Sequence, residues 1–264
     1  MPNALYPPIK PRSFGELLDV VLQIFRLSLL KCLPYATLAI IAGQLSTLYY
    51  LSRGRLPALD SNDPVGVALY GVGTLIFVVL SMVILLRQAT IAAGRPVTGA
   101  ADLRDMLKRA PAIAAISLLA GAAIAVFLLP ALALAPPYRT AGIALMLAPA
   151  AYMAIALQFS LPALVLARKG VLGSLVYSFR LVRGNWWRVA AFYVVGISVI
   201  LTLWMLVATI TTMALSDNGT DDMAISRALT SAAVLAVFAI GLTFYSALTL
   251  ALFGDLEVRK ANSR

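Results

Sequence analysis

Six long apolar runs constrain this 264-residue chain more than any other feature. A helix needs roughly 20 consecutive apolar residues to cross the hydrocarbon core of a bilayer, and no run has a charged residue in its interior. The runs are residues 33–51, 65–86, 112–134, 141–167, 189–215 and 228–253. A transmembrane barrel would show alternating segments of about ten residues instead. The sequence therefore predicts an all-α polytopic membrane protein with six transmembrane helices.

The composition agrees with a membrane class and sets the domain organisation. Hydrophobic residues make up 61% of the chain and charged residues 12%, whereas soluble domains contain about 25% charged residues. Residues 1–12 hold four prolines and no signal-peptide pattern, which predicts an extended, mobile cytoplasmic tail. We expect one membrane domain over residues 13–257 and a short cytoplasmic tail over 258–264.

Short amphipathic helices are predicted ahead of three pairs of spans, around residues 13–29, 98–111 and 170–187. The first is expected to begin at Ser13, because Ser13 and Glu16 have the spacing of a capping box. It either lies in the headgroup plane or extends the first span. The three segments suggest units of one surface helix and one helical hairpin, although little sequence identity supports a repeat.

The basic residues predict the orientation of the spans. With six spans, 17 of the 21 Lys and Arg fall on the side of the two termini, and only Arg53, Arg55, Arg139 and Arg227 fall on the other. Cytoplasmic loops carry the excess of Lys and Arg, so both termini are predicted to be cytoplasmic. The net charge of +10 then belongs to a basic rim that sets topology and attracts anionic lipid, and no nucleic-acid partner is expected.

The residues needed for catalysis do not form a recognisable set. The chain has no His and a single cysteine, Cys32, and its 11 acids are scattered along surface segments or gathered in one outer loop at residues 217–222. Catalytic sites normally combine a base, a nucleophile or a metal. We therefore expect no enzyme activity, no cofactor and no metal site.

Two groups of residues are candidates for binding. Arg180, Arg183, Trp186, Trp187 and Arg188 concentrate cations and indoles before the fifth span. They are predicted either to anchor the protein at the interface or to recognise an anionic lipid or a partner protein.

The second group lies in the fourth span. Gln158 and Ser160 stand beside Pro162, and they form either a polar pocket at a broken helix or a hydrogen bond between helices. A polar pocket there would suit a permease for a small neutral or amphipathic solute. That permease is the alternative to a lipid-associated or scaffolding role.

Three stretches carry a resemblance to a known family. They are RSFGELL at 12–18, SFRLVRGNWWR at 178–188 and FGDLEVR at 253–259. Their order and spacing resemble the bacterial glycerophosphoryl diester phosphodiesterase membrane domain family, over nearly the whole chain. Some members carry a soluble phosphodiesterase domain after the membrane part, whereas this sequence ends shortly after residue 253. The resemblance implies a stand-alone six-span protein of the bacterial inner membrane that lacks the catalytic domain.

Overall fold

The computed structural model describes residues 5–54, 63–95, 99–216 and 223–262. Across these ranges the secondary structure is entirely helical. The helices are α1 (Phe14–Gly43), α2 (Leu45–Ser52), α3 (Pro64–Ala92), α4 (Gly99–Lys108), α5 (Ala110–Leu132), α6 (Pro136–Leu157), α7 (Ser160–Val165), α8 (Val171–Val182), α9 (Trp186–Ser216) and α10 (Met223–Asn262).

Six helical stretches are long and apolar enough to cross a membrane, which confirms the predicted fold class. They are Phe14–Gly43, Pro64–Ala92, Ala110–Leu132, Pro137–Val165, Trp186–Thr211 and Ala232–Asn262. The fourth consists of α6 and α7, which are separated by a break at Gln158 and Phe159. Two of the expected short amphipathic helices, α4 and α8, form as separate elements.

The first short helix is not separate, because it continues into the first span. The predicted capping box is present: the Ser13 hydroxyl accepts from the Glu16 N–H at 3.3 Å, and the Glu16 carboxylate accepts from the Ser13 N–H at 2.7 Å. From there α1 runs unbroken to Gly43 and buries Leu17, Val21 and Ile24 in the protein core. This is the second of the two expected arrangements, in which residues 13–29 extend the helix of the first span. The apolar face of this segment packs against other helices rather than forming a surface helix.

Residues 5–12, which we call the N-terminal strap, are also packed rather than loose. The backbone N–H groups of Leu5 and Tyr6 donate to the Ala92 carbonyl at 2.9 and 3.4 Å, at the end of α3. Pro8 is buried, and a Cβ at Gly254 of α10 would meet Pro8 and Tyr6 at 2.8 and 2.9 Å. The absence of a side chain at Gly254 thus lets the strap lie directly on α10. The expectation of a mobile tail is wrong for these residues.

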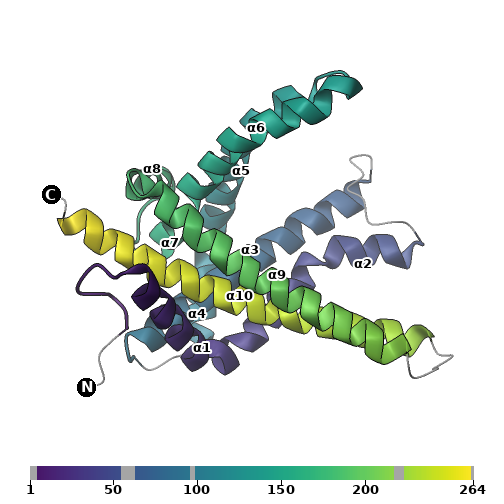
Figure 1. Cartoon of the computed structure of the whole chain (residues 1–264), viewed down its shortest axis with the longest axis horizontal. Coiled ribbons are helices and arrows are strands. Elements are labelled where there is room, and N and C mark those ends of the chain that lie inside the picture. Colours follow the sequence, from purple (N-terminus) through teal and green to yellow (C-terminus); the bar gives the residue numbers. More distant parts are fainter. Residues whose placement is uncertain (1–4, 55–62, 96–98, 217–222, 263–264) are drawn as a thin grey trace.

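The spans form three pairs that spread from a common end (Figure 1). The α1–α3, α5–α6 and α9–α10 pairs each pack along their length, and α10 also packs against α1 and α3. Both termini, α4 and α8 lie at the end where the pairs meet, while the α5–α6 pair diverges from the other two (Figure 1). The largest hydrophobic core lies near this common end, between α1, α3, α7, α8, α9 and α10.

A buried amide joins three of the spans. Gln88 of α3 is fully buried, and its Nε2 donates to Ser28 Oγ of α1 at 3.2 Å and to the Thr243 carbonyl of α10 at 2.9 Å. Because a buried N–H group is costly unless it is hydrogen-bonded, these two bonds from Nε2 favour the observed register of α1, α3 and α10.

Close contact between α1 and α3 depends on Gly73, and this can be tested against a glycine two residues away. A Cβ at Gly73 would collide with the Ala42 carbonyl oxygen, whereas a Cβ at Gly71 would meet nothing within 4 Å. Gly73→Ala should therefore lower stability in detergent by about 1–3 kcal/mol, the usual cost of overpacking. Gly71→Ala should be neutral or slightly stabilising, because alanine favours helix. Equal thermal unfolding of the two variants would contradict the packing described here.

Candidate functional site

The candidate site is organised by Asp255, a fully buried carboxylate in α10. Its Oδ1 accepts the Arg12 backbone N–H at 2.8 Å, and its Oδ2 accepts the Arg259 Nε–H at 2.8 Å. A second guanidinium, that of Arg188 at the start of α9, lies 3.3 Å from Oδ2. Because a buried charge is tolerated only when paired and hydrogen-bonded, Asp255 requires all three groups to come together.

The Arg12 carbonyl completes this network. It accepts a hydrogen bond from Arg188 Nη2 at 2.8 Å and another from Arg259 Nη2 at 2.6 Å. Each guanidinium therefore contacts both the carboxylate and the strap. Together with Asp255 they connect the N-terminal strap, the start of α9 and the end of α10, which are far apart in the sequence.

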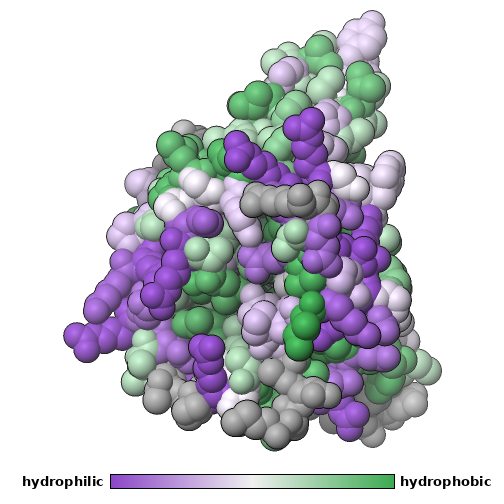
Figure 2. All heavy atoms as spheres, turned by 90° about the vertical axis from the view of Figure 1, so that its left-hand side faces the viewer, coloured by the Kyte–Doolittle hydropathy of each residue, from purple (hydrophilic) through white to green (hydrophobic). Residues whose placement is uncertain are grey.

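A basic recess lies beside this network. Its volume is about 450 Å³, and it combines four cations with two amides and two apolar residues. The lining residues are Pro11, Arg180, Leu181, Arg183, Asn185, Arg259, Lys260 and Asn262. Hydrophilic side chains gather on the face of the molecule that contains the common end of the helices (Figure 2). The recess can therefore offer several positively charged donors to one anionic group.

The structure divides the predicted lipid-contact residues into three kinds. Arg180 and Arg183 line the recess. Trp187 is 81% exposed, whereas Trp186 stacks on Tyr152 with ring centroids 5.5 Å apart. Arg188 points inward to Asp255, so its charge is used within the protein. The sequence placed these residues in one group, but it could not indicate that Arg188 pairs with Asp255 inside the protein while Arg180 and Arg183 line the recess.

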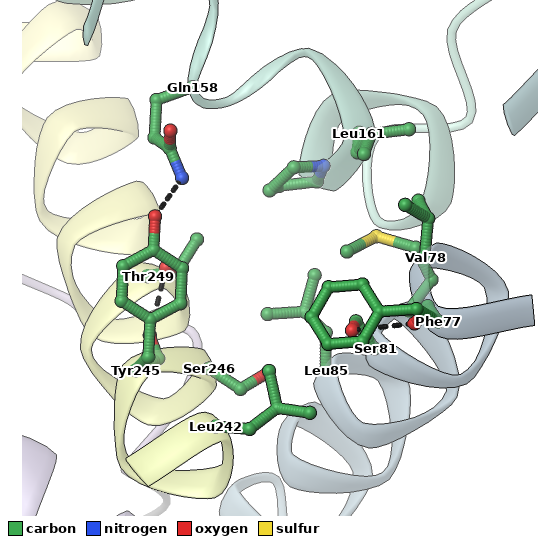
Figure 3. A pocket seen from close by; sticks show the side chains of 12 residues that line it. Phe77, Val78, Ser81, Leu85, Gln158, Leu161, Leu242, Tyr245, Ser246 and Thr249 are labelled. Atoms are coloured by element: carbon green, nitrogen blue, oxygen red, sulfur yellow. Dashed lines mark hydrogen bonds between the residues drawn. The ribbon is translucent and has the colours of Figure 1, made fainter. Parts of the chain in front are cut away.

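The two residues of the predicted polar pocket, Gln158 and Ser160, lie in different surroundings. Gln158 lines an apolar chamber of about 240 Å³ between α3, the α6–α7 break and α10, and its side-chain amide donates to the Tyr245 hydroxyl (Figure 3). Ser160 is buried outside the chamber lining, and its hydroxyl donates to the Leu157 carbonyl at 2.7 Å. Most of the chamber wall is apolar, from residues such as Phe77. The chamber suits a hydrocarbon group better than a charged solute.

Acidic groups pair at most locally over the part of the chain that the structure describes, as Asp102 and Asp105 do on α4. No three of its His, Cys, Asp or Glu residues lie close enough to hold a metal ion. Near the recess, Glu257 accepts a hydrogen bond from the Tyr177 hydroxyl at 2.6 Å, and the Tyr177 ring also has Lys169 and Lys260 nearby at 5.6 and 5.5 Å. The acidic loop at residues 217–222 lies outside the described residues.

Sequence reasoning missed Asp255 and the structural role of Arg259. The available signal was an acid directly after an apolar run, with an arginine four residues later on the same helix face. That spacing indicates a local pair. It could not indicate that residues of the strap and of α9 would meet the same carboxylate.

These features define a multi-pass helical membrane protein with a basic site where its helices converge. The family model for the membrane domain of glycerophosphoryl diester phosphodiesterase matches residues 110–264. The chain belongs to that family, as the resemblance in its sequence implied. No curated protein and no solved structure matches the chain.

Removing the charge of Asp255 should destabilise the protein. Asp255→Asn leaves the Arg188 and Arg259 guanidiniums without their counter-ion, so we expect a loss of about 3 kcal/mol, the lower range for breaking a buried pair. Thermal unfolding in detergent measures the loss, and faster tryptic cleavage after Arg12 would show release of the strap. Arg180→Gln is the matched control and should change stability by less than about 0.5 kcal/mol. Identical unfolding of both variants would contradict the role given to Asp255.

Proposed function

We propose that this protein is a non-enzymatic membrane protein that binds anionic phospholipid at its cytoplasmic face. The observation that carries the proposal is the basic recess, where Arg180 and Arg183 from the α8 end of the molecule face Arg259 and Lys260 from α10. No acid lines the recess among the residues that the structure describes. A phosphate group is the natural ligand for such a set, because guanidinium groups form paired hydrogen bonds with phosphate oxygens.

The surroundings of the recess favour a lipid over a soluble partner. Trp187 is exposed a few residues from Arg183, and exposed indoles are typical of the level where headgroups meet acyl chains. The recess lies where the spans converge, so a headgroup at the membrane surface can reach it. A partner protein that docks at the end of α8 would also use these cations, but it would not need the exposed indole.

We propose that the residues of the recess catalyse no reaction. The recess contains amides and permanent cations, which hold an anion in place but do not exchange protons near neutral pH. With no histidine in the sequence, binding is the chemistry that the recess supports.

A permease is the second candidate, and the apolar chamber favours it. The chamber lies in the middle of the spans, at the break between α6 and α7, and broken helices often line substrate sites in transporters. Loss of solute uptake in Gln158→Leu, with the recess intact, would support this candidate.

The recess can be tested with a charge-matched control. In Arg180→Gln/Arg183→Gln we expect less anionic phospholipid than in the parent to be retained through detergent purification. Losing two cations at about 1 kcal/mol each corresponds to about thirtyfold in affinity. Mass spectrometry of the co-purified lipid measures it. Arg104→Gln/Lys108→Gln removes the same charge from exposed positions of α4 and should retain the parent's lipid. Equal retention in all three proteins would refute the proposal.

We further propose that this protein lies in a bacterial inner membrane with both termini in the cytoplasm. The support is the distribution of 17 against 4 basic residues between the two sides.

Cysteine labelling tests that orientation on exposed positions. Leu172 of α8 is 70% exposed and Tyr138 of α6 is 68% exposed, while the native Cys32 is buried. A membrane-impermeant thiol reagent added to intact cells should label Tyr138→Cys and leave Leu172→Cys unmodified until the membrane is opened. The reverse pattern would show that the orientation is inverted.

A further inference from the structure

A second basic cavity, separate from the recess, lies beside the first residues of the strap, Tyr6 and Pro7. Its volume is about 240 Å³, and Tyr6 of the strap, the end of α3 and the end of α7 enclose it. Arg95 and Arg168 line it, together with the Thr90 hydroxyl, and no acid lines it within the described residues. None of its lining residues lines the recess.

The charge of the cavity favours a binding site, because Arg95 and Arg168 line it and no acid among the described residues does. Arg168 has a backbone φ of 50°, a left-handed conformation that costs a side-chain-bearing residue strain energy and often occurs at functional positions. The Tyr6 hydroxyl is a neutral donor, since burial and the nearby Glu257 carboxylate raise the pKa of this phenol. The Thr90 hydroxyl donates to the Leu86 carbonyl at 2.9 Å, so the cavity offers an anion the two permanent cations of Arg95 and Arg168.

The same helices, α3 and α7, line both this cavity and the apolar chamber, although no residue lines both. On α3 the chamber lining ends at Leu85 and the basic cavity begins at Leu86; after the α6–α7 break the chamber uses Pro162 and the basic cavity uses Val165. The two spaces therefore follow one another along the seam between α3 and α7. Figure 3 shows the chamber between these helices and α10. The seam is basic at its end and apolar in its interior.

We propose that the α3–α7 seam binds one anionic phospholipid, with its phosphate at Arg95 and Arg168 and one acyl chain in the apolar chamber. The match is one of charge and polarity: the ends of α3 and α7 supply cations, and no charged residue lines the chamber. A free anion would leave the chamber unused, and a neutral solute would leave the guanidiniums unused.

Photo-crosslinking of the full chain in mild detergent tests this site. The probe is phosphatidylglycerol with a photoreactive group at the end of one acyl chain. Crosslinks should concentrate on residues 77–85 and 242–249, and excess phosphatidylglycerol should compete with the probe. Competition by phosphatidylcholine or inorganic phosphate to the same extent would overturn the proposal, as would crosslinks spread evenly over the outward faces of the spans.

Matched variants separate the seam from general lipid contact. Arg168→Gly removes the cation and suits the left-handed backbone, so the fold is retained while crosslinking falls by about tenfold, the effect of losing one charge-assisted hydrogen bond. Ser81→Phe fills the chamber and should also suppress crosslinking, whereas Thr74→Phe, exposed on the same helix, should not. Equal crosslinking in Ser81→Phe and Thr74→Phe would refute the site.

Lipid binding at the recess and lipid binding in the seam can be tested independently. Arg180→Gln/Arg183→Gln should leave crosslinking in the seam at the parent level, because its side chains line only the recess. Loss of crosslinking in that variant would show that the seam does not bind lipid by itself and would overturn the proposal of a separate site.

Discussion

The rest of the structure depends on one buried carboxylate. Asp255 lies inside the end of the longest helix and is paired with Arg188 and Arg259, and it also accepts the Arg12 N–H. An ionised group of this kind is stable only with its partners in place. The interaction therefore decides where α9 begins relative to α10 and where the strap lies, because each supplies one of those partners.

The shape of the molecule follows from this fixed end. Three pairs of helices meet where the strap crosses α3 and α10, and the α5–α6 pair diverges from there (Figure 1). The chamber opens in the space between α3, the α6–α7 break and α10. The strap also forms part of both basic cavities, with Pro11 in the recess and Tyr6 in the seam. A segment of eight residues thus links the two candidate sites.

Hydropathy predicted the six spans because crossing a bilayer requires long apolar helices whatever their partners. Hydropathy carries no information on tertiary contacts, and the differences between prediction and structure occur where such contacts matter. The polar side of residues 13–29 suggested a surface helix, yet the opposite side packs into the core. Four prolines suggested a loose tail, yet Gly254 leaves room for Tyr6 and Pro8. The density of cations near 180 pointed to Arg180 and Arg183, which line the recess, but not to Arg259 and Lys260 of α10.

Arginine has two roles at this end of the protein, and the scarcity of acids decides between them. The chain has 21 Lys and Arg but 11 Asp and Glu, so basic residues must outnumber their possible partners. Asp255 uses Arg188 and Arg259 to hold the fold, although Arg259 still reaches the recess. Arg180 and Arg183 line one cavity, and Arg95 and Arg168 line the other. We therefore propose that the excess of basic residues, which predicts the orientation of the spans, also provides cations for phosphate groups of the surrounding lipid.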